Sequence, residues 1–184
     1  MDEAAVYLQQ IRTMSDFLVK QIDEVPADKF HERPGPHLNT VGWNVFHLLR
    51  IWDLDLNWIA RGQSPQEDAW HRGGFSEKAA YEPLGKGGRE LGLGFGYTDA
   101  DVDELAMPAD VLKEYHQMLL GETAGYLESA DAAELHREIE REGQQTETPA
   151  ARIQHTIGHC WNHIGEMRYA KGMLGMSDPS YPGR

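Results

Sequence analysis

Apolar residues recur at every third or fourth position through four long stretches of the sequence. In residues 2–24 the apolar positions include Leu8, Ile11 and Leu18, a spacing that places them on one face of an amphipathic α-helix. Pro26 follows this stretch, in a position typical of a helix end. The remaining three stretches predict helices over residues 40–60, 108–129 and 148–174, each to within a few positions.

Residues that favour helix starts precede these stretches. Asn39 or Thr40 can cap the second predicted helix through a side-chain oxygen. Pro108 is favourable at the first position of the third helix, and Thr148-Pro149 is a suitable start for the fourth. The patterns and the boundary residues therefore agree on the same four helices.

The predicted fold is a single all-α domain, residues 1–184, in which the four helices form a bundle. No internal repeat and no β pattern of strand length is evident. The connection between the second and third helices, residues 63–107, is long and partly irregular, with a glycine-rich part at residues 85–96. Short helices near residues 76–80 and 99–105 would shorten it. Connections of this length are often functional lids.

Charge and hydropathy disfavour several classes of function. The chain has 30 acidic and 17 basic residues, a formal net charge of −13. Nucleic acids and anionic membrane surfaces are recognised through lysine and arginine, so neither is an expected partner. No apolar run reaches the roughly 18 residues of a transmembrane helix. The expected partner is a small-molecule substrate.

Two further features favour a cytoplasmic protein. The N-terminus, Met1-Asp2-Glu3-Ala4, is acidic where a signal peptide would be basic. Cys160 is the single cysteine, so no disulfide can form within the chain.

Histidines in the fourth predicted helix are the first indication of chemistry. His155, His159 and His163 follow one another at intervals of four. Four residues turn a helix by about 400°, so neighbouring pairs lie on one face and can share one ion. The third histidine lies about 80° around the helix from the first, so a complete site needs a ligand from another helix. His47, within an apolar run, is the obvious donor, and spacing alone does not decide whether His155 or His163 pairs with His159.

Ordinary structural roles for these histidines remain open at this point. His47 could be a core histidine with satisfied hydrogen bonds. The pair in the fourth helix could instead be partly exposed histidines on the helix surface. The flanking Ile153, Ile157 and Trp161 argue against this role, because they predict that much of the helix circumference is buried. Burying neutral imidazoles without partners is costly, and a metal ion or dense hydrogen bonding would offset that cost. Cys160 lies about 100° from its neighbouring histidine and is a poor fit to the same ion.

A histidine lies in the apolar second helix, and the last helix contains two histidines four residues apart, followed by Gly165-Glu166. This order of residues resembles the DinB-like superfamily of metal-binding four-helix bundles. The resemblance covers the whole chain in helix order, and its motif is three histidines with short flanks. It implies a metal triad of His47, His159 and His163 and leaves His155 outside the ligand set.

The resemblance also implies classes of reaction. The superfamily includes S-transferases that use bacillithiol, mycothiol or glutathione, and proteins described as metal-dependent hydrolases. A low-molecular-weight thiol is therefore a candidate cofactor beside the divalent ion. Three histidine ligands with an open coordination position suit zinc first, and imidazole also suits nickel or iron.

Four residues close to the triad in sequence are candidates for catalysis or cofactor binding. Arg50 is a candidate for holding an anionic substrate or cofactor group, with a surface salt bridge as its alternative role. Glu166 can orient an imidazole or act as a base, or else pair with Arg168 or Lys171 on the helix surface. Trp43 and Asn44 are candidates for binding a cofactor.

These observations lead to two hypotheses for the function. In the first, the protein is a metal-dependent enzyme that performs thiol-dependent S-transfer, hydrolysis or isomerisation on a small molecule. In the second, it is a non-catalytic, stress-related binding or scaffold bundle whose metal is structural or absent, so enzymatic activity itself stays open. A homodimer that buries Trp52 or Trp58 on a helix face is compatible with either hypothesis.

Overall fold

The structure is a computed structural model that describes residues 2–86, 91–140 and 146–176. The predicted all-α class is confirmed: apart from one isolated β-bridge between Ile139 and Glu147, the described residues form helices and loops. The four long helices are α1 (Glu3–Asp23), α2 (Val41–Asp53), α6 (Ala109–Ser129) and α8 (Pro149–Met173).

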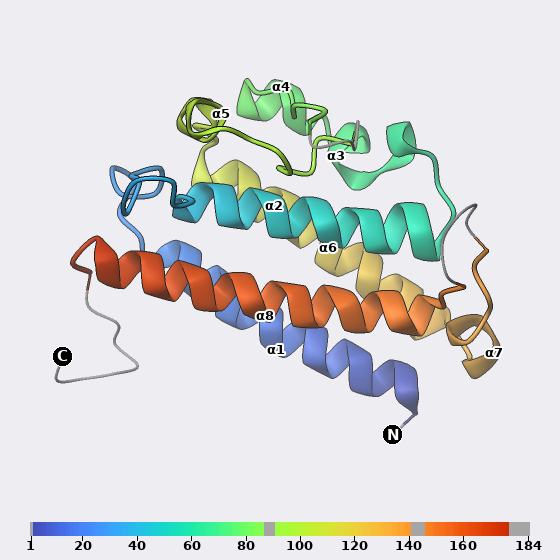
Figure 1. Cartoon of the computed structure of the whole chain (residues 1–184). Helices are drawn as coiled ribbons and strands as arrows, with labels where there is room; N and C mark the ends of the chain where they lie inside the picture. The colour runs from blue at the N-terminus through green and yellow to red at the C-terminus, as the bar shows by residue number, and fades with distance from the viewer. Residues whose placement is uncertain (1, 87–90, 141–145, 177–184) are drawn as a thin grey trace, which may run out of the picture.

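The four long helices form the predicted bundle (Figure 1). Helices α1 and α2 each pack against both α6 and α8, so they occupy diagonal positions. Helix α2 is buried along its whole length, because it lies between α6, α8 and the long connection that follows it. The interface between α2 and α8 is where the predicted histidine ligands meet.

Side-chain caps set the starts of three of the long helices. Thr40, rather than Asn39, caps α2 by accepting a hydrogen bond from the backbone N–H of Trp43 at 3.0 Å. Asp2 and Thr148 cap α1 and α8 in the same way. Pro108 is the residue before the first helical position, so α6 begins at Ala109, one position later than predicted.

The second predicted helix continues to Ala60, but its last part, Leu54–Ala60, is a π-helix. Two fully buried aspartates lie at this junction and face different elements. Asp53 accepts from the backbone N–H groups of Ala69 and Trp70 at 3.1 and 3.0 Å. Asp55 accepts instead from side chains of α8. Residues two apart point to opposite sides of a helix, so the pair ties α2 to the connection on one side and to α8 on the other.

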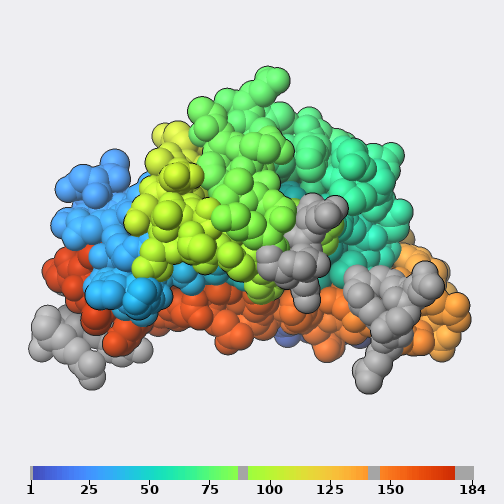
Figure 2. Space-filling model, turned by 45° about the horizontal axis from the view of Figure 1, so that its top comes forward, coloured from blue at the N-terminus to red at the C-terminus, as the bar shows by residue number. Residues whose placement is uncertain are grey.

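The long connection forms a packed layer over α2. Its described residues contain a 3₁₀ turn (Pro65–Glu67) and the short helices α3 (Ala69–Arg72), α4 (Phe75–Ala79) and α5 (Asp99–Glu104). The two short helices expected near 76–80 and 99–105 are thus present. Figure 1 shows its short helices above α2, and Figure 2 shows the layer, in green to yellow, covering this face of the molecule. Trp70 and Phe75 are buried in it, so the connection has an apolar core of its own continuous with that of the bundle. Residues 87–90 of the glycine-rich part lie outside the described residues.

Trp52 belongs to the core and not to an exposed helix face. It is 0% exposed and donates through Nε1 to Thr123 Oγ1 on α6 at 2.9 Å. A homodimer interface through Trp52 is therefore ruled out by its burial, while Trp58 is half-buried.

Among the described residues, no helix combines the length and the apolar character needed to cross a bilayer.

Candidate metal centre

The structure brings His47 of α2 together with His159 and His163 of α8. One ring nitrogen from each histidine lies within 4.8 Å of the other two. The closest pair is Nε2 of His159 and Nε2 of His163, 3.2 Å apart. His47 and His163 are buried and His159 is half-buried. Of the two pairs that spacing left open, the structure brings His159 and His163 together with His47, as a group that could hold a metal ion.

Hydrogen bonds hold the imidazole of His163 with Nε2 facing the triad. Its Nδ1 lies 2.8 Å from Oδ1 of Asn44 and 2.9 Å from the Glu166 carboxylate. Both partners are acceptors toward this nitrogen, because Asn44 uses its amide nitrogen to donate to the carbonyl of Thr40. The proton of neutral His163 therefore sits on Nδ1, and Nε2 keeps its lone pair. This is the arrangement in which second-sphere partners orient a metal-binding histidine.

His47 is fixed in the same way by the glycine-rich part of the connection. Its Nδ1 donates to the backbone carbonyl of Leu93, which leaves Nε2 unprotonated. Its ring stacks on Trp43, with ring centroids 4.7 Å apart and an interplanar angle of 15°. Phe95 closes on it edge-to-face from the connection, with centroids 4.9 Å apart. Trp43 therefore supports a candidate ligand directly.

His159 differs from the other two because its second nitrogen has no anchor. Its Nδ1 is buried and has no hydrogen-bond partner among the residues that the structure describes. Its ring is held instead by neighbouring imidazoles, with centroids 4.5 Å from His163 and 5.6 Å from His155. A bound ion would give this histidine a strong polar partner at Nε2.

The donor set fits a divalent ion. In a tetrahedral site with metal–nitrogen bonds of about 2.0–2.1 Å, two ligand nitrogens lie roughly 3.3 Å apart. The 3.2 Å between the Nε2 atoms of His159 and His163 matches this value without any movement. His47 completes the set across the interface between α2 and α8.

Burial keeps all three imidazoles neutral at physiological pH. Loss of solvation lowers the pKa of His47 to about 4, partly opposed by its hydrogen bond to the Leu93 carbonyl. Burial, followed by the proximity of His163, His47 and His155, lowers the pKa of His159 to about 3. Burial also lowers the pKa of His163, partly opposed by Glu166. Neutral imidazole is the form that binds metal, so the site is in its ligand state at pH 7.

His155 lies beside the triad and is held away from it by Asp55. Its Nδ1 is 2.6 Å from the Asp55 carboxylate, which also accepts from Thr156 at 3.0 Å. Asp55 is fully buried, and its carboxylate raises the pKa of His155. Sequence reasoning missed Asp55. The signal that could have identified it is an aspartate between two apolar residues, Leu54 and Leu56, within a helix predicted to be largely buried.

Arg50 is committed to protein partners inside the fold. Its guanidinium is 2% exposed and donates to the Asp68 carboxylate at 2.9 Å and to the Tyr115 hydroxyl at 3.3 Å. It also donates to the carbonyls of Leu91 and Gly92 at 3.0 and 3.3 Å. The salt bridge expected as its alternative role is present, but it is buried and not at the surface. This placement favours a structural role for Arg50 over the binding of an anionic ligand. Asp68 and Tyr115 are the buried partners that hold Arg50 in this role.

The glycine-rich strap, defined here as residues 91–96, is thus held at two adjacent points. Arg50 holds its first two carbonyls, and His47 donates to the third. Gly94 lies at φ +89°, and a Cβ there would come within 3.2 Å of Trp43 and 3.3 Å of His47 Nδ1. Only glycine combines this backbone angle with this close approach.

Glu166 is the sequence-predicted residue that faces both the site and solvent. Its side chain is 55% exposed, and its carboxylate lies 2.9 Å from Nδ1 of His163. Of its two alternative partners, Arg168 and Lys171, Lys171 is paired with Glu24 at 2.7 Å. The contact with His163 is the geometry that an orienting role for Glu166 requires.

Comparisons with known proteins agree with this arrangement. The sequence model of the DinB superfamily matches residues 8–167. A solved structure described as a conserved protein of a locus from Enterococcus faecalis is similar to this chain, with a TM-score of 0.77 and 17% sequence identity. The likeness covers 95% of this chain and 99% of that one, and at this identity it concerns the fold. Comparison with curated protein sequences gives no match.

Proposed function

The chain belongs to the DinB superfamily, and we propose that it binds a divalent metal ion through His47, His159 and His163 and uses it to transform a small molecule. The observation that carries this proposal is the convergence of three neutral imidazoles, one pair of which already has the nitrogen separation of a tetrahedral site. Zinc is the first candidate, with nickel or iron as alternatives.

The reaction class follows from the number of ligands. Three protein ligands are typical of catalytic rather than structural zinc sites, where a fourth position stays open for water or substrate. A divalent ion held there would supply Lewis acidity. It would lower the pKa of a bound water molecule or thiol, so that this group could lose its proton near neutral pH. We therefore propose hydrolysis, isomerisation or S-transfer with a low-molecular-weight thiol as the reaction.

The chain's own residues orient the ligands and exclude water. Asn44 and Glu166 keep the proton of His163 on Nδ1, and the Leu93 carbonyl does the same for His47. Trp43 and Phe95 cover the His47 ring, so the nitrogen facing the triad is shielded from bulk solvent. This environment prepares the ligands before an ion arrives, which reduces the cost of binding it.

Elemental analysis of purified protein tests the metal proposal. The wild-type protein is expected to carry about one equivalent of a divalent metal, and His159→Ala is expected to lose it. His155→Ala is the matched control, because His155 is one turn away on the same helix and is engaged by Asp55. Metal retained in His159→Ala at the wild-type level would rule out the triad.

The catalytic part of the proposal is tested separately from metal binding. Metal-loaded protein is assayed with pairs of low-molecular-weight thiols and electrophiles, and with ester and amide substrates. Metal-dependent turnover that disappears in His159→Ala supports an enzyme. A large fall in melting temperature on chelation, with no turnover on any substrate, would support the non-catalytic scaffold instead.

A further inference from the structure

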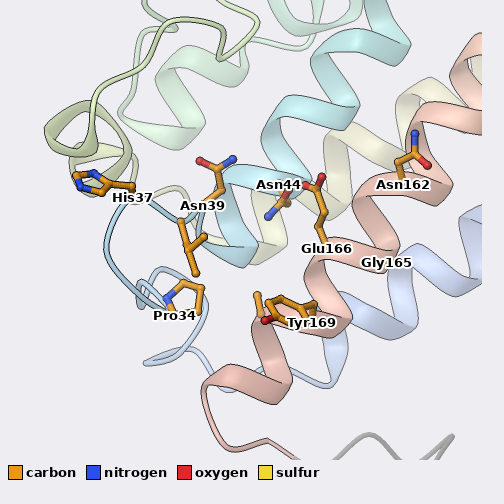
Figure 3. Close-up of a pocket in the computed structure, with 10 residues that line it drawn as sticks. Pro34, His37, Asn39, Asn44, Asn162, Gly165, Glu166 and Tyr169 are labelled. Atoms are coloured by element: carbon orange, nitrogen blue, oxygen red, sulfur yellow. The ribbon is translucent and has the colours of Figure 1, made fainter.

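A pocket separate from the metal ligands lies between the loop before α2 and the C-terminal half of α8. Its volume is about 550 Å³, within the range of small-molecule sites. Figure 3 shows the loop residues Pro34, His37 and Asn39 on one side and the α8 residues Glu166 and Tyr169 on the other. None of the three candidate metal ligands lines it.

The pocket adjoins the outer side of His163. The Nε2 atom of His163 faces His159, whereas its Nδ1 faces Asn44 and Glu166. Asn44 and Glu166 both line the pocket. A ligand there would therefore meet the groups that orient His163, on the side of the ring away from the proposed ion.

The lining specifies the charge of the ligand. The Glu166 carboxylate reaches the pocket and is 55% exposed, and Asn39 and Asn162 add amide groups. Among the lining residues that the structure describes there is no lysine or arginine, and the one imidazole, His37, lies 2.8 Å from the Asp99 carboxylate. An anionic ligand would find no fixed positive partner, and the chain's net charge of −13 also opposes it.

The same lining specifies an apolar body beside the charge. Tyr169 is 68% exposed, an unusual state for an aromatic side chain, and Pro34 and Leu38 lie across the pocket from α8. An aromatic face next to a carboxylate is a combination that recognises organic cations through cation–π contact and ion pairing. We propose that this pocket binds a small organic ammonium compound, with its charged nitrogen at Glu166 and its apolar part against Tyr169.

Gly165 provides the space that makes the pocket accessible. A Cβ at Gly165 would meet no heavy atom within 4 Å, although the residue lies within α8 and lines the pocket. A larger side chain at this position would project into open space, so it can block the pocket without disturbing the packing of the helix. Gly172 is the matched control position, since it lies on the same helix with equally open space and is outside the pocket lining.

The experiment uses the full chain in its metal-free form, so its outcome does not depend on the proposed metal function. Three probes of similar shape are titrated with detection by calorimetry or NMR: 2-phenylethylamine, 2-phenylethanol and 3-phenylpropanoate, which are cationic, neutral and anionic at pH 7. The amine is expected to bind at least about fivefold more tightly than the others, since an ion pair at a partly exposed site contributes about 1 kcal/mol.

Variants locate the binding. Glu166→Gln is expected to reduce the affinity for the amine to that of the alcohol, whereas Glu128→Gln, which removes an exposed charge on α6, is expected to leave it unchanged. Gly165→Leu is expected to abolish binding and Gly172→Leu to retain it. Equal affinities for the three probes, or amine binding that survives both Glu166→Gln and Gly165→Leu, would overturn the proposal.

Discussion

Asn44, a buried residue that the sequence offers as a candidate for binding a cofactor, acts with Glu166 in the structure to set the tautomer of His163. Asn44 is 2% exposed, and its two amide atoms have different partners, the His163 ring and the Thr40 carbonyl. Because an amide oxygen accepts and cannot donate, it holds the histidine proton on the nitrogen away from the triad. A single side chain thereby connects the start of α2 to the ligand state of α8.

Replacing Asn44 with leucine should weaken metal binding. The substitution removes an acceptor from Nδ1 of His163, and the loss of such a partner typically costs 10- to 100-fold in metal affinity. Competition titration with a chromogenic chelator measures the change. Asn44→Asp keeps an acceptor for His163 but loses the donor to the Thr40 carbonyl, so it should bind metal more tightly than Asn44→Leu. Equal losses in both variants would show that packing, not the acceptor, is what matters.

Arg50 gives a residue-scale prediction about stability. Arg50→Met would leave the buried carboxylates of Asp53 and Asp68 without their cation, and breaking a buried pair from one side costs about 3–5 kcal/mol. Urea denaturation measures the free energy of unfolding. Arg61→Met is the control, because its pair with Glu122 is partly exposed and should contribute less than about 1 kcal/mol. Similar losses in the two variants would contradict the structural role of Arg50.

At the scale of elements, the strap at residues 91–96 is the part of the long connection that contacts the candidate metal centre. Gly94 approaches both Trp43 and His47, so its replacement by alanine should displace the strap and loosen His47. We expect weaker metal binding in Gly94→Ala, measured by the same competition titration. Gly74→Ala is a matched control: Gly74 also has a positive φ, of +62°, but a Cβ there meets nothing within 4 Å.

Both glycine variants should lose roughly 1 kcal/mol of stability, because alanine is disfavoured at positive φ. Only Gly94→Ala should change the affinity for metal. If Gly74→Ala reduced metal affinity equally, the effect would come from general destabilisation and not from contact between the strap and His47.

The long helices were predictable because each buries one face, and burial imposes a period of three to four residues on the sequence. The triad was predictable for a related reason. An interval of four on a helix fixes the relative directions of His159 and His163 before any tertiary contact is known. His47 is the expected third donor from its place in an apolar run, and the resemblance to the superfamily selects His163 over His155. The structure brings these three histidines together.

The partners of these residues were not predictable, because they come from contacts between distant parts of the chain. The Leu93 carbonyl reaches His47 from 46 positions away, and Asp55 reaches His155 across 100. A backbone carbonyl carries no residue-specific signal in the sequence. The role of Arg50 shows the same limit, since nothing local indicates that Asp68 and the strap enclose it.

At the scale of the whole molecule, buried neutral histidines make stability depend on pH. His116 on α6 lies 2.7 Å from the Ser15 hydroxyl on α1 and is 1% exposed. Burial lowers its pKa from 6.5 to about 4. An unfolded chain therefore binds a proton at this residue between pH 6.5 and 4 that the folded chain does not bind. Stability from this group is present above pH 6.5 and is lost as the pH falls toward 4.

His116→Gln isolates that contribution, because glutamine can keep a hydrogen bond to Ser15 but does not titrate. Between pH 7 and 5 the wild-type protein should lose on the order of 1–2 kcal/mol more stability than the variant. Urea denaturation of metal-free protein at several pH values measures both curves. His47 and His159, whose pKa values are also lowered, remain in both proteins, so their contribution cancels in the difference. Parallel curves would mean that His116 takes up its proton in the folded state as readily as in the unfolded one, and that the contact between α1 and α6 tolerates the charge.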